Sequence, residues 1–173
     1  FNEKDIYLSL QSRLVSAGFE HGAKLRAEVL RREYGCSAST VREALFRLST
    51  LGLVNFQEQR GFRVPERSLE KLKEITHMRV LLEGEGTVLS IRKGGVAWEA
   101  RLTAAHHQLS HIEKRIHTTE DPTELVPIWF NAEREFHQTL ISACGSETLQ
   151  ELHARLYAQF RQLSLIHISE PTR

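Results

Sequence analysis

Apolar positions along the chain follow two different patterns. In the first third they recur at helical spacing in three short stretches, and the stretches end at residues that stop helices, such as Gly18 and Gly35. The inward positions of these stretches are Ile6, Leu10 and Leu14, then Leu25, Val29 and Leu30, then Val41, Leu45 and Leu48. From Leu69 onward all apolar positions recur at helical spacing, in longer stretches and without β-like runs. The pattern therefore predicts a mainly α protein with two parts.

A polar turn separates the second and third short helices. The second helix is expected to end near Gly35, and the third to start between Ser37 and Ser39, which is typical of a helix-turn-helix. After a glycine C-cap signal at Gly52, two β-like runs at 52–56 and 60–64 predict a hairpin, the wing. We expect a winged helix-turn-helix over residues 1–66.

The remaining pattern predicts an all-α bundle over residues 68–163. Helices are expected at 69–92 and 98–117, from a loop at 119–127 to Ala143, and from about Ser146 onward. The last ten residues, 164–173, break this periodicity and resemble translated sequencing-adapter sequence, so we expect a non-native tail there. Since the chain also opens without a methionine, we expect a fragment whose bundle is truncated.

Composition limits the class of protein. A chain of 173 residues with 40% hydrophobic content can hold two small cores. No apolar run approaches the roughly 20 residues that cross a bilayer, and no signal segment precedes the first helix, so we expect a cytoplasmic protein without a membrane partner. The net charge of +1 says little, but six basic residues against three acidic ones lie between Lys24 and Arg47. This local excess indicates a surface for phosphate.

Residues that read DNA in such a domain come from the start of the recognition helix and from the wing. Hydroxyl and guanidinium groups there can reach base edges or phosphates. The candidates are Arg26, Ser37, Ser39, Thr40, Arg42, Arg47, Arg60 and Gly61. Ser37 and Ser39 fit a helix-capping role equally well, and a hairpin turn can require glycine on conformational grounds alone.

Two ionisable pairs lie on apolar stripes in the second part. Glu133 and His137 are one turn apart on the stripe from Trp129 to Cys144, and they fit either a metal site or a buried hydrogen bond. Arg79 lies among leucines, four residues before Glu83. Its guanidinium fits either an internal ion pair with Glu83 or a small carboxylate effector.

Residues 6–64 resemble the DNA-binding domain of the GntR family of bacterial regulators. The residues that carry this resemblance are Leu25, Leu30, Tyr34-Gly35, Ser37, Val41 to Leu45, Leu48, Gly52-Leu53, Arg60-Gly61 and Val64. Two positions depart from the family, which often has arginine in place of Ala38 and a basic residue near Glu28. The resemblance implies a double-stranded DNA operator as partner, whose sequence cannot be carried over.

The second part resembles the FCD type of ligand-binding domain found in the FadR-like branch of that family. Arg79 with Glu83, the run 133–137, and Cys144-Gly145-Ser146 carry this resemblance. It implies a homodimer formed through the helical half and a small organic acid as effector. It also implies a divalent metal of the Zn, Ni or Mn class, with Glu133 where Asp is usual, His137 matching, and two further histidines beyond residue 163. Residues 94–99 and the Gly145 region are similar to a subgroup that responds to dicarboxylates such as glutarate.

These features predict a sequence-specific transcription regulator, commonly a repressor, and not an enzyme. A metal-dependent enzyme with Glu133 as base and His137 as ligand is the first alternative, but the chain has no His-Glu-x-x-His, no Gly-x-Ser-x-Gly and no phosphate-cradling glycine loop. An effector-independent DNA-binding adaptor is the second alternative. A small acid that shifts the melting temperature of the full-length protein would argue against the adaptor.

Overall fold

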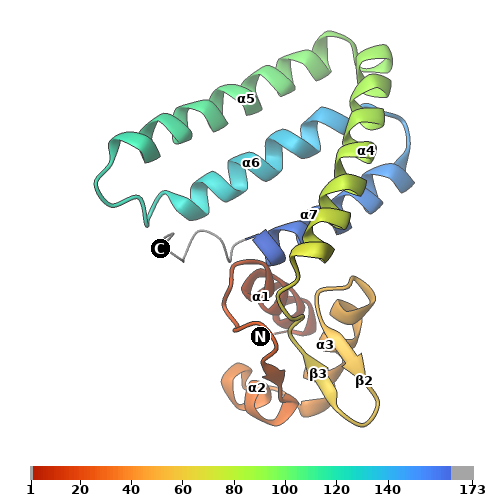
Figure 1. The fold of residues 1–173 in the computed structure, drawn as a ribbon, viewed down its shortest axis with the longest axis vertical. Coiled ribbons are helices and arrows are strands. Elements are labelled where there is room, and N and C mark those ends of the chain that lie inside the picture. Colours follow the sequence, from red (N-terminus) through yellow and green to blue (C-terminus); the bar gives the residue numbers. More distant parts are fainter. Residues whose placement is uncertain (1, 165–173) are drawn as a thin grey trace. The chain divides into compact units, whose positions relative to one another are not determined.

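The computed structural model describes residues 2–164, which are mainly helical (Figure 1). They form two compact units. One comprises the N-terminal residues up to Thr76 together with the end of the last helix from Arg155, and the other comprises His77–Ala154. The expected non-native tail lies outside the described residues, except for Ser164, which ends the last helix. No helix within residues 2–164 is both long enough and apolar enough to cross a bilayer.

The first unit is a winged helix. Its elements are α1 (Glu3–Val15), β1 (Lys24–Leu25), α2 (Ala27–Tyr34), α3 (Ala38–Thr50), β2 (Asn55–Gln57) and β3 (Gly61–Arg63). The strands form an antiparallel sheet in the order β1-β3-β2, with Phe56 opposite Phe62 in the wing hairpin. Gly35 ends α2 in the left-handed region at φ 64°, where a side chain would be strained, so the chain turns at once into α3.

The core of this unit is built from the positions that the helical spacing predicted, with one exception. Val29 was expected to point inward but is 57% exposed, because α2 buries Leu30 and Tyr34, which are one helical turn apart on another side of the helix. Ile6, Leu10, Leu45 and Leu48 are fully buried, and Val64 from the end of the wing packs with them. Burying these side chains against one another is what holds the three helices in a fixed arrangement. The winged helix-turn-helix expected from the sequence is confirmed.

The end of α7 (Glu147–Ser164) belongs to this same unit. Gln159 donates a hydrogen bond of 2.7 Å to the carbonyl of Leu51, and Gln162 donates one of 2.9 Å to the carbonyl of Leu53. Ala158 packs on the core. Two backbone acceptors directly after α3 are thus satisfied by side chains more than 100 residues away along the chain.

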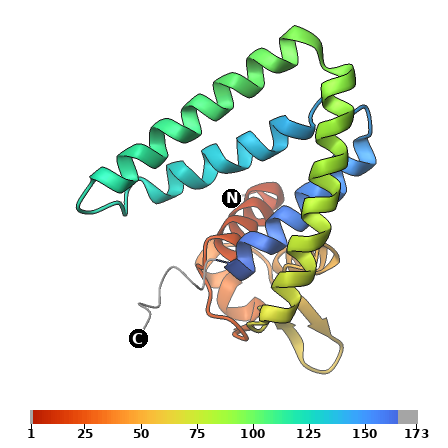
Figure 2. The same ribbon diagram turned by 45° about the horizontal axis from the view of Figure 1, so that its top comes forward.

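The second unit is helical throughout. It contains the larger part of α4 (Leu69–Lys93), then α5 (Gly95–Thr118) and α6 (Val126–Ile141), and the start of α7. Helices α5 and α6 lie side by side as an antiparallel hairpin in both views (Figures 1 and 2). Leu109 and Ile112 of α5 pack on Ala132 of α6. The all-α bundle is confirmed.

One helix begins earlier than its periodicity predicts. We expected a start at Trp98, but α5 begins at Gly95. Gly95 has φ 59°, so the chain reverses direction within one residue and the helix resumes without a loop. Trp98 is then buried in the first turn, where its indole N–H donates to the carbonyl of Thr139 at 2.8 Å.

Candidate DNA interface and effector site

The recognition helix α3 presents one polar face to solvent. Val41, Leu45 and Leu48 are buried, whereas Ser39 and Arg42 are exposed, in keeping with the 3.6-residue period of a helix. The turn between α2 and α3 leaves the first residues of this face accessible. A helix held by its apolar side and free on its polar side can enter a groove of DNA.

Ser37 and Thr40 are engaged in capping the helix. The Ser37 hydroxyl oxygen accepts from the backbone N–H of Thr40 at 3.1 Å and lies 2.9 Å from the Thr40 hydroxyl. Both groups therefore stabilise the start of α3. The helix-capping role that the sequence allowed for Ser37 is present in the structure. Ser39, two positions after Ser37, is exposed and is not part of this cap.

The predicted arginines do not all lie on the same surface. Arg42 is exposed on the outer face of α3. Arg47 is five residues further, about 140° around the helix, and its guanidinium lies over the Tyr7 ring at 4.4 Å and 3.8 Å from the Glu3 carboxylate. Arg26 is exposed at the N-cap of α2 without capping it through its side chain. Arg42 is thus the cation on the same outer face as Ser39.

The wing tip has the geometry that the sequence predicted. Arg60 is exposed, and Gly61 adopts φ 71°, a conformation that favours glycine, with open space around its Cα. Arg63 further along β3 donates to the backbone carbonyl of Gly22 at 3.2 Å, which ties the strand to the loop before β1. A cation at the tip of a supported hairpin can contact the DNA backbone or the minor groove.

In the second unit, Arg79 and Glu83 form an internal ion pair. Arg79 Nε lies 3.5 Å from Glu83 Oε2, and only 8% of Arg79 is exposed. A nearly buried guanidinium needs an anion, and Glu83 supplies one. Of the two alternatives for Arg79, the internal ion pair with Glu83 is therefore the one that the structure contains.

Glu83 also joins two histidines from other helices. Its Oε1 accepts from His137 Nδ1 on α6 at 2.6 Å, and its Oε2 accepts from His153 Nε2 on α7 at 2.8 Å. Burial raises the pKa of the Glu83 carboxyl, but the hydrogen bonds from both histidines and the positive charge of Arg79 outweigh burial and lower that pKa to about 2. One carboxylate thereby connects α4, α6 and α7.

Sequence reasoning assigned no role to His153. It is fully buried and lies on the same side of α7 as Leu149 and Tyr157, which are four residues before and after it and are also buried. That spacing was a signal in the sequence, because an imidazole on an apolar stripe needs a polar partner. In contrast, His106, His107, His111 and His117 are exposed.

Glu133 and His137 converge as the helical spacing predicted. Glu133 Oε1 lies 3.6 Å from His137 Nε2, and both side chains are mostly buried. Because His137 donates through Nδ1 to Glu83, its Nε2 lone pair is directed to the side of Glu133. Metal-binding histidines commonly donate their other ring N–H to a carboxylate in this way. Within residues 2–164, however, no group of three or more His, Cys, Asp or Glu side chains could hold a metal ion. The described part of the chain thus brings Glu133 and His137 together without forming a complete metal site.

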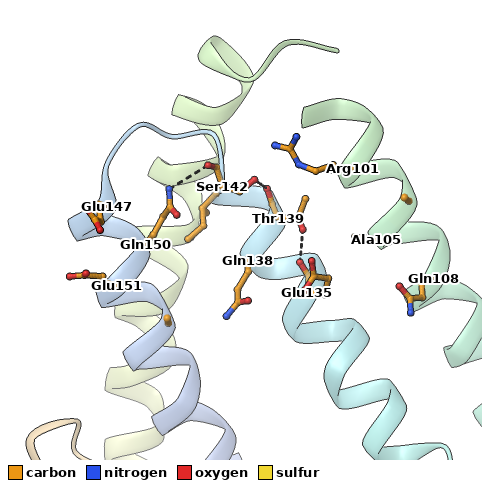
Figure 3. Close-up of a pocket in the computed structure, with 13 residues that line it drawn as sticks. Arg101, Ala105, Gln108, Glu135, Gln138, Thr139, Ser142, Glu147, Gln150 and Glu151 are labelled. Carbon is orange, nitrogen blue, oxygen red and sulfur yellow. Dashed lines mark hydrogen bonds between the residues drawn. The ribbon is translucent and has the colours of Figure 1, made fainter. Parts of the chain in front are cut away.

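A groove of about 710 Å³ lies on a different face of α6 (Figure 3). It is lined from α5, α6 and α7, with Glu135, Glu147 and Glu151 as anions and Arg101 as the one cation among its lining residues. An acidic lining repels an organic acid. None of Arg79, Glu83, Glu133 and His137 lines it, so the groove and the Arg79–Glu83 cluster are separate features.

A winged helix with an exposed cation on its recognition helix has the form of a DNA-binding domain. The same chain carries a helical unit with a buried arginine–carboxylate–histidine cluster. Comparison with known proteins agrees. Residues 2–64 match the bacterial regulatory proteins of the gntR family, and residues 74–173 match the FCD domain. The chain belongs to the GntR family of transcription regulators and carries an FCD domain, as the sequence resemblance predicted.

Individual relatives are also named as transcription regulators. The chain is 38% identical over 167 residues to the uncharacterized HTH-type transcriptional regulator BphR of Paraburkholderia xenovorans, covering 95% of this chain and 67% of that protein. It is 30% identical over 153 residues to the HTH-type transcriptional repressor GlaR of Escherichia coli, covering 88% of this chain and 68% of that protein. The chain thus spans about two thirds of the length of these relatives.

A solved structure confirms the fold. Escherichia coli McbR/YncC superimposes with a TM-score of 0.75 at 22% identity, covering 96% of this chain and 76% of that one. A putative GntR regulator from Rhodococcus gives a TM-score of 0.70 at 22% identity, covering 95% and 74%. At this identity the likeness supports the arrangement of helices and strands and nothing finer.

Proposed function

We propose that this protein is a repressor whose binding to a DNA operator is controlled by a small organic acid bound in its FCD unit. The observation that carries the proposal is the pairing of two features in one chain, the exposed cationic face of α3 and the buried Arg79–Glu83 cluster. GntR regulators bind operators, and one relative is named a transcriptional repressor. An operator lies on the chromosome, so the site of action would be the bacterial cytoplasm.

The DNA-contacting residues would be those of the outer face of α3 and of the wing. Arg42 would contact a guanine edge or a phosphate, Ser39 would lie at the groove floor, and Arg60 would follow the backbone from the wing tip. Arg26 would add a phosphate contact from the start of α2. Ser37 and Thr40, held in the cap, would act by fixing how α3 enters the groove.

Members of this family typically dimerise, and we propose a homodimer here as well. Two winged helices related by a twofold axis would bind half-sites about 10 base pairs or a multiple of that apart on a pseudo-palindromic operator. We propose residues 1–66 as the DNA-reading part and residues 68–163 as the regulatory part.

The effector would bind at Arg79. A guanidinium has five N–H donors in a planar fork, so it can serve two carboxylates, one from Glu83 and one from a ligand. A dicarboxylate fits this chemistry, because its second carboxylate can meet another donor in the unit. Effector binding would alter how Glu83 is shared among Arg79, His137 and His153, and such a differential contact is what control requires.

A divalent metal would sit between Glu133 and His137. Carboxylate oxygen and imidazole nitrogen are the donors that Zn, Ni and Mn accept, and their approach to 3.6 Å fits two ligands of one ion. When bound, the metal would supply positive charge for the effector acid. Further ligands would have to come from outside residues 2–164 or from water. In the full-length protein, His137→Ala should lower the metal content by elemental analysis, while the exposed His107→Ala should not.

The test of the proposed function is operator selection with the full-length protein. Fragments bound from a random DNA pool would be sequenced with and without a panel of dicarboxylates and a divalent metal. A palindromic site whose occupancy falls with one acid supports a metabolite-controlled repressor and identifies its ligand class. A site that no acid affects contradicts effector control, and binding without sequence preference contradicts operator recognition itself.

A further inference from the structure

An exposed aromatic side chain lies on the recognition helix. Phe46 is 53% exposed on α3, four residues after Arg42 and seven after Ser39, so the three share the outer face of the helix. The neighbouring apolar positions Leu45 and Leu48 are fully buried in the core. The core is thus complete without Phe46.

The wing holds the Phe46 ring in place. The Phe56 ring of β2 lies 5.8 Å from it in an edge arrangement, at an interplanar angle of 77°. Phe56 in turn packs 4.8 Å from Phe62, its partner across the hairpin. A ring that is already ordered loses little conformational freedom when it meets a binding partner.

The surroundings of Phe46 favour DNA as that partner. Whatever covers Phe46 also meets Arg42 on the same face, and Arg60 lies at the tip of the wing that carries Phe56. An apolar ring next to an arginine on the same helix face matches a surface that is polyanionic and has local apolar groups. In the major groove the apolar group is the C5-methyl of thymine, which phenylalanine can contact directly.

We propose that Phe46 is a specificity-determining residue that contacts a thymine C5-methyl group in each operator half-site. The inference rests on the proposed operator binding and adds to it a base preference for which Ser39 and Arg42 cannot account, since hydroxyl and guanidinium groups read hydrogen-bonding edges. The contact excludes water from the part of the Phe46 ring that Phe56 leaves exposed.

Deoxyuridine tests the contact, because it differs from thymidine only in lacking that methyl. Each thymine of the selected operator would be replaced singly by deoxyuridine, and the affinity of the full-length protein measured on every site. At the contacted position the wild-type protein should lose about fourfold in affinity, the ratio expected for one buried methyl-sized group. Phe46→Ala should bind the thymine site more weakly and show no further loss with deoxyuridine there.

Matched variants separate this contact from a general effect on the fold. Leu8→Ala removes another exposed apolar side chain, on α1, and should retain the full sensitivity to deoxyuridine. Phe46→Leu and Phe46→Gln change the side chain without deleting it, so they serve if the alanine variant fails to fold. The leucine variant should keep part of the methyl preference, and the glutamine variant should lose it.

Two results would overturn the proposal in different ways. If wild type and Phe46→Ala respond equally to deoxyuridine at every position, Phe46 only supports the wing and the inference is wrong, although operator binding stands. If the wild-type protein selects no operator at all, the proposed function fails and the inference fails with it.

Discussion

His153 Nε2 donates a 2.8 Å hydrogen bond to Glu83 Oε2, although the two residues are 70 positions apart in the chain. His137 Nδ1 occupies the other oxygen of the same carboxylate at 2.6 Å. An ionised carboxylate only accepts, so both imidazoles must present N–H groups to it, and their tautomers are assigned by that requirement. Glu83 thus sets the orientation of two imidazole rings from two different helices, the mostly buried His137 and the fully buried His153.

Replacing Glu83 should destabilise the protein. In Glu83→Gln one oxygen becomes an amide NH₂, which cannot accept from a histidine N–H, so a buried donor loses its partner. We expect a loss of about 1–3 kcal/mol in the free energy of unfolding at pH 7, measured by urea denaturation. Glu85→Gln, an exposed position on the same helix, should change the stability little. Equal stabilities of the two variants would mean that the Glu83 hydrogen bonds make no net contribution to the free energy of unfolding.

The same comparison should depend on pH in a defined direction. The pKa of Glu83 is lowered in the folded protein from 4.5 to about 2, so the folded state favours the ionised form. Its contribution to stability is therefore complete above pH 4.5 and is lost as the pH falls toward 2. The difference between wild type and Glu83→Gln should be constant from pH 7 to about pH 5 and shrink below pH 4.5. A difference that grows on acidification would contradict this assignment.

Two glycines on roughly opposite sides of α4, Gly84 and Gly86, should respond oppositely to alanine. A Cβ at Gly86 would lie 2.6 Å from Ile141 Cγ2 and 3.0 Å from Leu149 Cδ2, whereas nothing lies within 4 Å of a Cβ at Gly84. We expect Gly86→Ala to destabilise by about 1–3 kcal/mol through overpacking. Gly84→Ala should stabilise by about 0.5–1 kcal/mol, because alanine has the higher helix propensity. If Gly86→Ala raised the urea midpoint as Gly84→Ala does, the packing around Gly86 would be looser than these distances indicate.

The sequence was sufficient to predict the features that depend on local spacing. The α3 cap at Ser37, the turn at Gly35 and the approach of Glu133 to His137 all lie within one or two helical turns, where spacing alone fixes which side chains meet. The contacts of His153 with Glu83 and of Gln162 with Leu53 span 70 and 109 positions. Such pairs depend on how helices pack, which the periodicity of one segment does not determine.

The Gln162 contact makes a prediction about the winged-helix unit. Its amide donates to the Leu53 carbonyl at 2.9 Å, and only 3% of Gln162 is exposed. Gln162→Ala leaves that acceptor without the donor, so we expect a loss of about 1–3 kcal/mol in the free energy of unfolding. Gln162→Glu should be at least as damaging, because an ionised carboxylate cannot donate. Gln138→Ala at an exposed position is the matched control, and a loss there as large as at Gln162 would contradict the prediction.

The arginines of α3 should differ in their effect on operator affinity. Arg42 is exposed on the outer face, whereas Arg47 is engaged with Tyr7 and Glu3. Arg42→Ala should weaken operator binding by about 1–3 kcal/mol if the guanidinium reads a base, with loss of preference at one operator position. If it contacts a phosphate instead, binding should weaken uniformly across sequences and the salt dependence of affinity should fall by about one unit.

Titrations of wild type, Arg42→Ala and Arg47→Ala on the same operator at several salt concentrations distinguish these outcomes. Arg47→Ala should have the smaller effect on affinity, because its side chain already has an intramolecular carboxylate and ring as partners. Its main effect should be on the packing of α3 against α1, which thermal unfolding in the absence of DNA would detect. If Arg42→Ala changes neither affinity nor salt slope while Arg47→Ala abolishes binding, the DNA-facing side of α3 is the one toward α1, and the outer face carrying Ser39 and Arg42 is not the operator-reading surface.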